Sequence, residues 1–310
     1  MTAETNTHLF GTLTIVGLGL IGSSIARAAR KHGLAAEIRG GDVSEQVCGI
    51  SKSLGFVDSA TTDLGAAVDG ADLVIICVPI GAFKAVGDVI APRLRPGALL
   101  SDVGSVKQAA FAQIAPLLSD GIHFIPGHPV AGTEFSGPEA GFAELFENRW
   151  CILTPKPDAD KDALERLSDF WTRMGSKVEI MDAEHHDLVL AITSHVPHLI
   201  AYNIVGTASD LEEVTQSEVI KYSAGGFRDF TRIAASDPTM WRDVFLNNKE
   251  AVLEMLGRFT EDLTALQRAI RWGDGDALFS HFTRTRAIRK SIIEAGQETP
   301  QPDFGRSGKS

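Results

Sequence analysis

Short apolar runs alternate with helix-like patterns over the first 180 residues of the chain. Near-continuous Val, Ile and Leu runs, such as TLTIV at 12–16 and LVIICV at 73–78, are typical of strands buried on both faces of a parallel sheet. Helical spacing lies between most of them, for example at 21–32 and 163–174. Seven runs fit strands: 12–16, 37–41, 73–78, 99–102, 123–126, 151–154 and 177–181. This alternation predicts an α/β fold, with helices on both faces of a doubly wound, Rossmann-type sheet.

The strand pattern stops near residue 182. Long helical patterns follow it, at 183–206, 238–272 and 277–295. We therefore expect three parts: an α/β domain over 1–182, an all-α domain over 183–295, and a disordered polar tail over 296–310. Helices such as 244–266 carry more apolar positions than one small helical domain can bury, which predicts a homodimer through this domain.

Composition and charge narrow the class of protein. The 310 residues are 44% hydrophobic and 22% charged, as in an ordinary globular protein. A net charge of −11 disfavours nucleic acid and anionic membranes as partners. The three cysteines are far apart and outside any CxxC pattern, so neither a disulfide framework nor a zinc ribbon is expected. With no signal peptide or membrane span evident, we expect a cytoplasmic protein.

A glycine-rich loop, GLGLIG, follows the first strand and opens the first helix. Gly17 permits a tight turn, Gly19 lets a pyrophosphate approach the backbone, and Gly22 lets the helix pack on the strand. Asp42, twenty residues beyond Gly22, can bind an adenosine ribose and repel a 2′-phosphate, which favours NAD over NADP. The alternative for Asp42 is a turn residue at the end of a strand. The other expected cofactor contacts are Leu20, Ile21, Val78, Pro79 and Ser105.

The segment DVGSVK at 102–107 follows another strand. Because the carboxyl ends of strands face the ligand crevice in open α/β sheets, we expect Ser105 and Lys107 to point toward the cofactor and substrate. The alternative is that Ser105 caps the helix beginning near Val106.

The segment GHPVAGTEFSG at 127–137 predicts a loop around His128 and Glu134 at the same sheet edge. A histidine beside a nicotinamide can accept a hydroxyl proton while hydride leaves the same carbon. The alternative is a structural histidine.

The helical part contains EHHD at 184–187 and SHVPH at 194–198. Four histidines and two acids could suggest a metal site. We favour a polar helix face over the substrate, because Pro197 disturbs the helix and NAD chemistry needs no metal.

The segment GGFRDFTRI at 225–233 carries two arginines after a glycine pair. Guanidinium groups bind carboxylates bidentately, so Arg232, with Arg228 on the same helix face, predicts a carboxylate clamp. The alternative is a weak surface pair between Arg228 and Asp229.

Over about residues 12–290 the chain resembles the prephenate and arogenate dehydrogenase family of tyrosine biosynthesis. The resemblance rests on these motifs, in order: GLGLIGSS, DVGSVK, GHPVAGTEFSG, LTP, EHHD, SHVPH and GGFRDFTRIAASDPTMW. It implies NAD-dependent oxidative decarboxylation of prephenate to 4-hydroxyphenylpyruvate, with arogenate, or both substrates, as the alternative. It also implies dimerisation through the helical domain.

The same resemblance assigns roles to single residues. His128 would be the catalytic base toward the ring hydroxyl, with Ser105 hydrogen-bonded to it or to the substrate. The implied substrate contacts are Arg232 at a carboxylate, His195 and His198 lining the pocket, Asp229 and Glu134 ordering it, and Trp241 near the partner subunit's site.

Two other classes remain open from the sequence. A dehydrogenase of the β-hydroxyacid or 6-phosphogluconate kind would carry a catalytic lysine followed by an asparagine. Here Lys249 follows Asn247 and Asn248, and that class leaves the GHPVAG segment unexplained. The other class is a non-catalytic NAD-binding protein.

Overall fold

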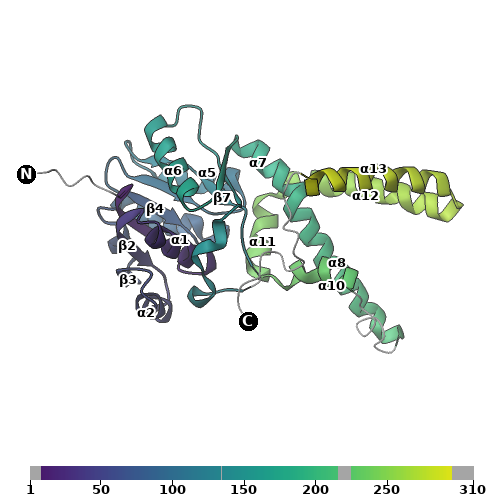
Figure 1. Ribbon diagram of the computed structural model, residues 1–310, viewed down its shortest axis with the longest axis horizontal. Coiled ribbons are helices and arrows are strands. Elements are labelled where there is room, and N and C mark those ends of the chain that lie inside the picture. Colours follow the sequence, from purple (N-terminus) through teal and green to yellow (C-terminus); the bar gives the residue numbers. More distant parts are fainter. Residues whose placement is uncertain (1–7, 134, 216–224, 295–310) are drawn as a thin grey trace, which may run out of the picture. The chain divides into compact units, whose positions relative to one another are not determined.

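The computed structural model describes residues 8–133, 135–215 and 225–294. Its centre is a six-stranded, all-parallel sheet in the order β3-β2-β1-β4-β5-β6 (Figure 1). The strands are β1 Phe10–Val16, β2 Ala35–Gly41, β3 Ser59–Thr61, β4 Leu73–Ile76, β5 Leu99–Asp102 and β6 His123–Phe124. The order reverses between β1 and β4, and such switch points form the ligand crevice of doubly wound folds. The predicted Rossmann-type fold is confirmed.

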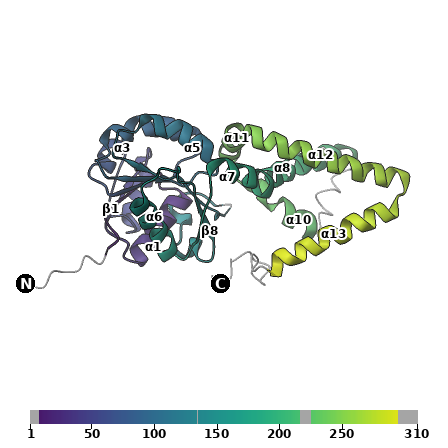
Figure 2. The same cartoon turned by 90° about the horizontal axis from the view of Figure 1, so that it is seen from above.

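Helices cover both faces of this sheet, as Figure 2 shows for α1 and α6 on one side and α3 and α5 on the other. Side chains of β4 pack alternately on the two faces of the sheet: Leu73 and Ile75 belong to one core cluster, and Val74 and Ile76 to the other. This double burial explains the continuous apolar runs in the sequence. The helices are α1 Leu20–Lys31, α2 Glu45–Ser53, α3 Leu64–Val68, α4 Phe83–Ile90, α5 Lys107–Ile114 and α6 Lys161–Arg173.

A second sheet stands beside the first and holds three strands. They are β7 Gly127–Pro129, β8 Trp150–Leu153 and β9 Lys177–Ile180, with β7 antiparallel to β8 and β8 parallel to β9. The prediction that the runs at 151–154 and 177–181 join the main sheet is therefore wrong. Apolar patterning marks a strand but does not specify its partner, which is why sequence alone merged the two sheets.

After β9 the described chain is helical. Its elements are α7 Ala183–Leu190, a π-helical turn Ala191–His195, α8 Val196–Thr215, α10 Gly225–Thr231, a 3₁₀ turn Arg232–Ala235, α11 Pro238–Asn247 and α12 Lys249–Trp272. Two predicted long helices are thus interrupted. The π turn precedes Pro197, which has no N–H to continue the ladder. The second break falls at Asn248, whose φ of −112° and ψ of 35° are not helical.

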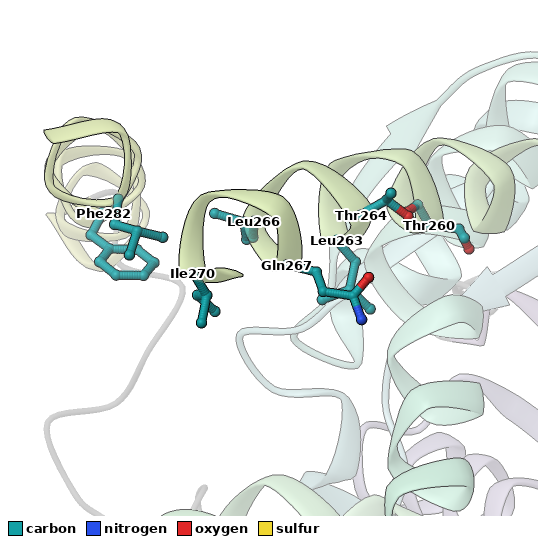
Figure 3. A pocket seen from close by; sticks show the side chains of 8 residues that line it. Thr260, Leu263, Thr264, Leu266, Gln267, Ile270 and Phe282 are labelled. Atoms are coloured by element: carbon teal, nitrogen blue, oxygen red, sulfur yellow. The ribbon is translucent and has the colours of Figure 1, made fainter. Parts of the chain in front are cut away.

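The chain forms two compact units that divide between residues 253 and 254. The second unit contains α12 from Glu254 onward and the whole of α13, Gly275–Glu294. A turn at Gly273, with a φ of +69°, joins the two helices. These two helices diverge from the turn in Figure 2. Side chains including Leu263, Ile270 and Phe282 line an apolar groove near it (Figure 3). Because Trp272 is 78% exposed, the unit leaves large apolar surface uncovered.

One helical stretch of the described chain, Ala183–Asp210, is long and apolar enough to cross a membrane by length and composition alone. The same stretch contains His186, Asp187 and His195, all buried against other parts of the first unit. Ionisable groups are rare in membrane spans, and these have partners within the folded protein. These contacts show that residues 183–195 of the stretch pack within the first unit, while 28% of the apolar window as a whole is buried.

Candidate active site

The glycine loop has the geometry of a dinucleotide-binding turn. Gly17 has a φ of +98°, and a Cβ there would lie 2.8 Å from the Cys77 backbone. A Cβ at Gly22 would lie 2.0 Å from the Gly17 carbonyl oxygen, so this glycine is needed for packing. A Cβ at Gly19 would meet nothing within 4 Å, and this open space lies at the N-cap of α1. No side chain caps α1 and no acidic residue lies in its first turn, which suits a pyrophosphate.

Asp42 supports this loop through both oxygens of its carboxylate. Its Oδ2 accepts the Leu18 N–H at 2.9 Å, and its Oδ1 accepts the Ser44 N–H at 3.0 Å. It is therefore a turn residue as well, as the alternative stated, and it is only half-buried. A carboxylate has further lone pairs for ribose hydroxyls. Of the other predicted cofactor residues, Leu20 and Ile21 lie at the start of α1, Val78 lies against Gly17 of the loop, and Pro79, next to Val78, is exposed.

His128 lies in β7, paired with Ile152 of β8, and not on the expected loop. Its ring is 8% exposed, and its Nδ1 lies 2.9 Å from Nε2 of His186 on α7. Nδ1 of His186 lies 2.8 Å from Oδ1 of Asp187. We call this row of side chains, His128, His186 and Asp187, the histidine relay. The sequence predicted His186 and Asp187 only as parts of a polar helix face over the substrate, with no separate role for either residue.

Asp187 sets the direction of the hydrogen bonds in the relay. Its two oxygens accept the backbone N–H groups of Lys107 at 2.7 Å and Gln108 at 2.9 Å, which open α5. Burial raises the pKa of Asp187, and these two N–H groups oppose that effect. With both oxygens held as acceptors, His186 donates from Nδ1 and accepts the Nδ1–H of His128 at Nε2. Nε2 of His128 is left with a free lone pair.

Burial keeps both relay histidines neutral. It lowers the pKa of His128 well below its usual value of 6.5, and the charge of Lys107 adds to this effect. Burial lowers the pKa of His186 to about 2. A neutral imidazole with a fixed Nδ1–H is the form that can accept a proton at Nε2. The relay therefore leaves His128 neutral, with its Nε2 unprotonated.

Lys107 does not point into the crevice, so that expectation is wrong. Its side chain is fully buried, and its Nζ donates to Asp102 and, at 2.6 Å, to the Gly127 carbonyl. Its role is to support β7 directly beside His128. The proposed helix cap is also wrong: the N-cap of α5 is Val106, and the carboxylate of Asp187 takes over the capping function. Ser105 lies half-buried in the β5–α5 loop, at the carboxyl edge of β5.

A second group of polar side chains comes from the helices after β9. His195 is 0% exposed, and its Nδ1 lies 3.0 Å from Nδ2 of Asn248. Burial lowers the pKa of His195 to about 4. Asn248 was not predicted as a site residue. A non-helical asparagine between two helical patterns is the kind of residue that satisfies buried groups at a helix junction.

His198 joins two of the predicted substrate residues. Its ring stacks on Trp241 with centroids 3.7 Å apart, and its Nδ1 donates to the Ser194 carbonyl at 2.9 Å. Burial lowers the pKa of His198, and the positive charge of nearby Arg232 adds to this. Trp241 is buried within its own subunit by these contacts. The structure thus brings His195, His198, Trp241 and Arg232 together.

Other predicted residues are not part of this cluster. Arg228 is 80% exposed, and its Nε lies 3.9 Å from Oδ1 of Asp229, which is 69% exposed, so the pair matches the surface-pair alternative. Glu134 lies outside the described residues. Lys249, which the β-hydroxyacid alternative needs in the site, is 63% exposed. Among the side chains that the structure describes, no three His, Cys, Asp or Glu are placed so that they could hold a metal ion.

Fold and site together define a class. A glycine turn with open space at the N-terminus of α1 suits a dinucleotide at the switch point of the sheet. Gly127 lies against the last residue of β5, so β7 brings the neutral His128 to the same carboxyl edge. A base beside a nicotinamide site is the arrangement of an NAD-dependent oxidoreductase.

Comparison with known proteins gives the family. The model of the prephenate dehydrogenase nucleotide-binding domain matches residues 25–180, and that of the prephenate dehydrogenase dimerization domain matches 182–284. The chain is 42% identical over 284 residues to a cyclohexadienyl dehydrogenase of Zymomonas mobilis, covering 92% of this chain and 97% of the relative. It is 33% identical over 282 residues to a prephenate dehydrogenase of Bacillus subtilis, covering 91% and 76%.

A solved structure agrees with these relatives. Prephenate dehydrogenase from Aquifex aeolicus, in complex with hydroxyphenyl propionate and NAD⁺, is 34% identical with a TM-score of 0.85, covering 91% of this chain and 98% of that one. The chain belongs to the prephenate dehydrogenase family and is an NAD-dependent oxidoreductase.

Proposed function

We propose that the protein catalyses the NAD-dependent oxidative decarboxylation of prephenate to 4-hydroxyphenylpyruvate, a step of tyrosine biosynthesis, with His128 as the base. One observation carries the proposal: a buried, neutral histidine whose Nδ1 is fixed by the relay, at the carboxyl edge of a dinucleotide-binding sheet. The names of the relatives support the substrate class.

The chemistry needs one proton acceptor. His128 accepts the ring hydroxyl proton of prephenate at Nε2, because its Nδ1 is occupied by His186. Bound NAD supplies the acceptor for the hydride that leaves the same ring carbon. When carbon dioxide leaves, its bonding electrons make the ring aromatic, and the ring oxygen regains a proton from His128. Prephenate and NAD⁺ thus give 4-hydroxyphenylpyruvate, carbon dioxide and NADH, and His128 returns to its neutral form.

Arg232 and Ser105 complete the proposed site. Arg232 is half-buried and close enough to His198 to lower its pKa, so it can place a guanidinium beside the ring stack of His198 and Trp241. Such a group binds a substrate carboxylate through two parallel hydrogen bonds. Ser105 lies at the carboxyl edge of β5 and is free to hydrogen-bond the substrate hydroxyl or His128.

The alternative substrate is arogenate, which differs from prephenate by an amino group in place of the side-chain keto group. The cyclohexadienyl dehydrogenase relative favours activity on both compounds. The test is to follow reduced nicotinamide with each substrate and with NAD or NADP. NAD-dependent turnover of prephenate supports the proposal, turnover of arogenate alone moves it to the alternative, and turnover of neither contradicts it.

We also propose a cytoplasmic homodimer formed through the helices after residue 182. Helices α12 and α13 expose apolar side chains, among them Leu263, Ile270, Trp272 and Phe282. A second copy of the chain would bury this apolar surface. The matched dimerization-domain model supports this. Light scattering should give the mass of two chains, about 66 kDa from 33.2 kDa each. A monomer at working concentration would contradict the proposal.

A further inference from the structure

Asn248 connects two parts of the site that are far apart in the sequence. It lies between α11 and α12 and is 4% exposed. Its Nδ2 donates to the Asp187 backbone carbonyl at 2.9 Å and lies 3.0 Å from Nδ1 of His195. The contacts span 61 and 53 residues of sequence, so the amide is held from two sides.

The contact with Asp187 fixes the orientation of this amide. A carbonyl oxygen only accepts hydrogen bonds, so the amide atom facing it must be the NH₂ group. The second hydrogen of the same NH₂ group points to Nδ1 of His195, which is then the acceptor. Burial lowers the pKa of His195 to about 4, so the ring is neutral at neutral pH and carries its single proton on Nε2.

Nε2 of His195 is a buried donor that has no hydrogen-bond partner among the described residues. Leaving a buried N–H without an acceptor is costly, and such groups in native proteins call for an explanation. The ring lies beside the site: its centroid is 6.0 Å from that of Trp241, and its charge state influences the pKa of His128 and His186. A substrate oxygen is the acceptor that this position lacks.

We infer that Asn248 is a positioning residue: it holds the His195 proton on Nε2, and His195 then donates a hydrogen bond to a carboxylate or carbonyl oxygen of the substrate. His128 and His195 are thus held as opposite tautomers, and both are linked to Asp187. His186, bound to the Asp187 side chain, makes His128 a proton acceptor at Nε2, and Asn248, bound to the Asp187 backbone, makes His195 a donor at Nε2. The identity of the acceptor rests on the proposed function, whereas the position of the proton does not.

The position of the proton can be read directly by NMR. In a long-range ¹H–¹⁵N spectrum of the full chain labelled with ¹⁵N-histidine at neutral pH, the His195 signals are assigned by their loss in His195→Gln. We expect Nε2 of His195 to be protonated and Nδ1 to be unprotonated. A proton on Nδ1, or rapid exchange between both nitrogens, would overturn the inference. This measurement needs no Asn248 variant, so it decides even if such variants fail to fold.

Kinetics tests whether the position of the proton matters. Because hydrogen bonds to charged groups are strong, Asn248→Ala should lower kcat/KM for prephenate roughly 10- to 100-fold, mainly through KM, while KM for NAD changes little. Asn248→Asp should lose at least as much, since a carboxylate accepts from Nδ1 and moves the proton there. The matched control is Asn247→Ala, whose amide bonds the Asp243 carbonyl and not His195, and it should stay within about two-fold.

A double variant separates this role from a general structural one. If Asn248 acts through His195, adding Asn248→Ala to His195→Gln should cost less than about two-fold more. If Asn248→Ala lowers kcat/KM equally in the wild-type and His195→Gln backgrounds, the inference is refuted. It is also refuted if Asn248→Ala alone keeps kcat/KM within two-fold of wild type. If the wild-type enzyme oxidises neither prephenate nor arogenate, the proposed function fails, and the NMR spectrum still decides whether Asn248 sets the proton.

Discussion

The glycine loop and the histidine relay of this protein are built in different ways. The glycine loop presents backbone: open space beside Gly19 and uncapped N–H groups of α1, from one stretch of sequence. The relay presents side chains, and its contacts join residues 58 and 80 positions apart, such as His128 with His186 and Lys107 with Asp187. Backbone recognition depends on local conformation, whereas side-chain recognition depends on how distant elements pack.

This difference determines what a substitution does in each region. In the loop, single side chains contribute modestly, and only a Cβ at a closed position such as Gly22 disrupts the turn. In the relay, each side chain is the hydrogen-bond partner of the next, so removing one changes the protonation of the others. The largest effects on catalysis should therefore follow changes at the relay, and the smallest should follow changes at the loop.

The largest effect is expected at His128. Without the imidazole, no group accepts the ring hydroxyl proton, so His128→Asn should lower kcat for prephenate by roughly two to four powers of ten. KM for NAD should change little, because the dinucleotide depends on the backbone of the glycine loop. Steady-state kinetics between pH 6 and 8 measures both, and near wild-type turnover would show that another group is the base.

Arg232 offers the next largest effect. If its guanidinium binds a substrate carboxylate in a desolvated site, Arg232→Ala should raise KM for prephenate at least roughly ten-fold and leave KM for NAD nearly unchanged. Arg232→Lys should rescue only part of the loss, because an ammonium lacks the two-pronged geometry. Arg228→Ala is the matched control, since that side chain is 80% exposed, and it should behave as wild type. Equal loss at both positions would argue against a specific clamp.

The same difference governs what could be predicted from the sequence. Gly17, Gly19 and Gly22 were assigned from one short motif, because their roles follow from local turn geometry. His128 was predicted on a loop and lies in a strand, because its strand partner in β8 is 24 positions away in the sequence. Asn248 received no role, since its function depends on two contacts more than 50 positions away.

The capping of α5 is a second feature that depends on distant packing. The sequence offers Ser105 as a cap, but the helix has Val106 at its N-cap, a residue that cannot satisfy the free N–H groups. The carboxylate of Asp187 accepts from these groups instead. Sequence alone could not choose it among 40 acidic residues, because the choice requires the packing of α7 on α5.

An effect on the whole fold, and not on catalysis alone, is expected from the buried histidines in acid. The pKa values of His186 and His195 fall from 6.5 to about 2 and about 4 in the folded protein, so below pH 6.5 the unfolded chain binds more protons than the folded one. The contribution of these two histidines to the free energy of unfolding is therefore fully present above pH 6.5. It is lost as the pH falls, until about pH 4 for His195 and about pH 2 for His186. At pH 5 these two residues alone should cost about 4 kcal/mol.

Denaturant unfolding from pH 8 to pH 4.5 measures this decline. In His195→Gln, the dependence of the free energy of unfolding on pH should weaken by close to one proton near pH 5. A free energy of unfolding that stays constant between pH 6.5 and pH 5 would mean that the buried histidines are charged in the folded protein.

The smallest effect is expected at Asp42, where two contributions can be separated. Its carboxylate repels a 2′-phosphate, which affects NADP alone, and it also holds the Leu18 and Ser44 N–H groups, which supports the loop for both cofactors. Asp42→Ser should therefore raise KM for NAD, while the preference of kcat/KM for NAD over NADP narrows by roughly ten-fold. Because Asp42 is half-buried, the repulsion is open to screening, and 0.5 M salt should narrow the wild-type preference but hardly that of the variant. A preference that is independent of salt in both proteins would mean that the shape of the loop, and not the charge of Asp42, selects the cofactor.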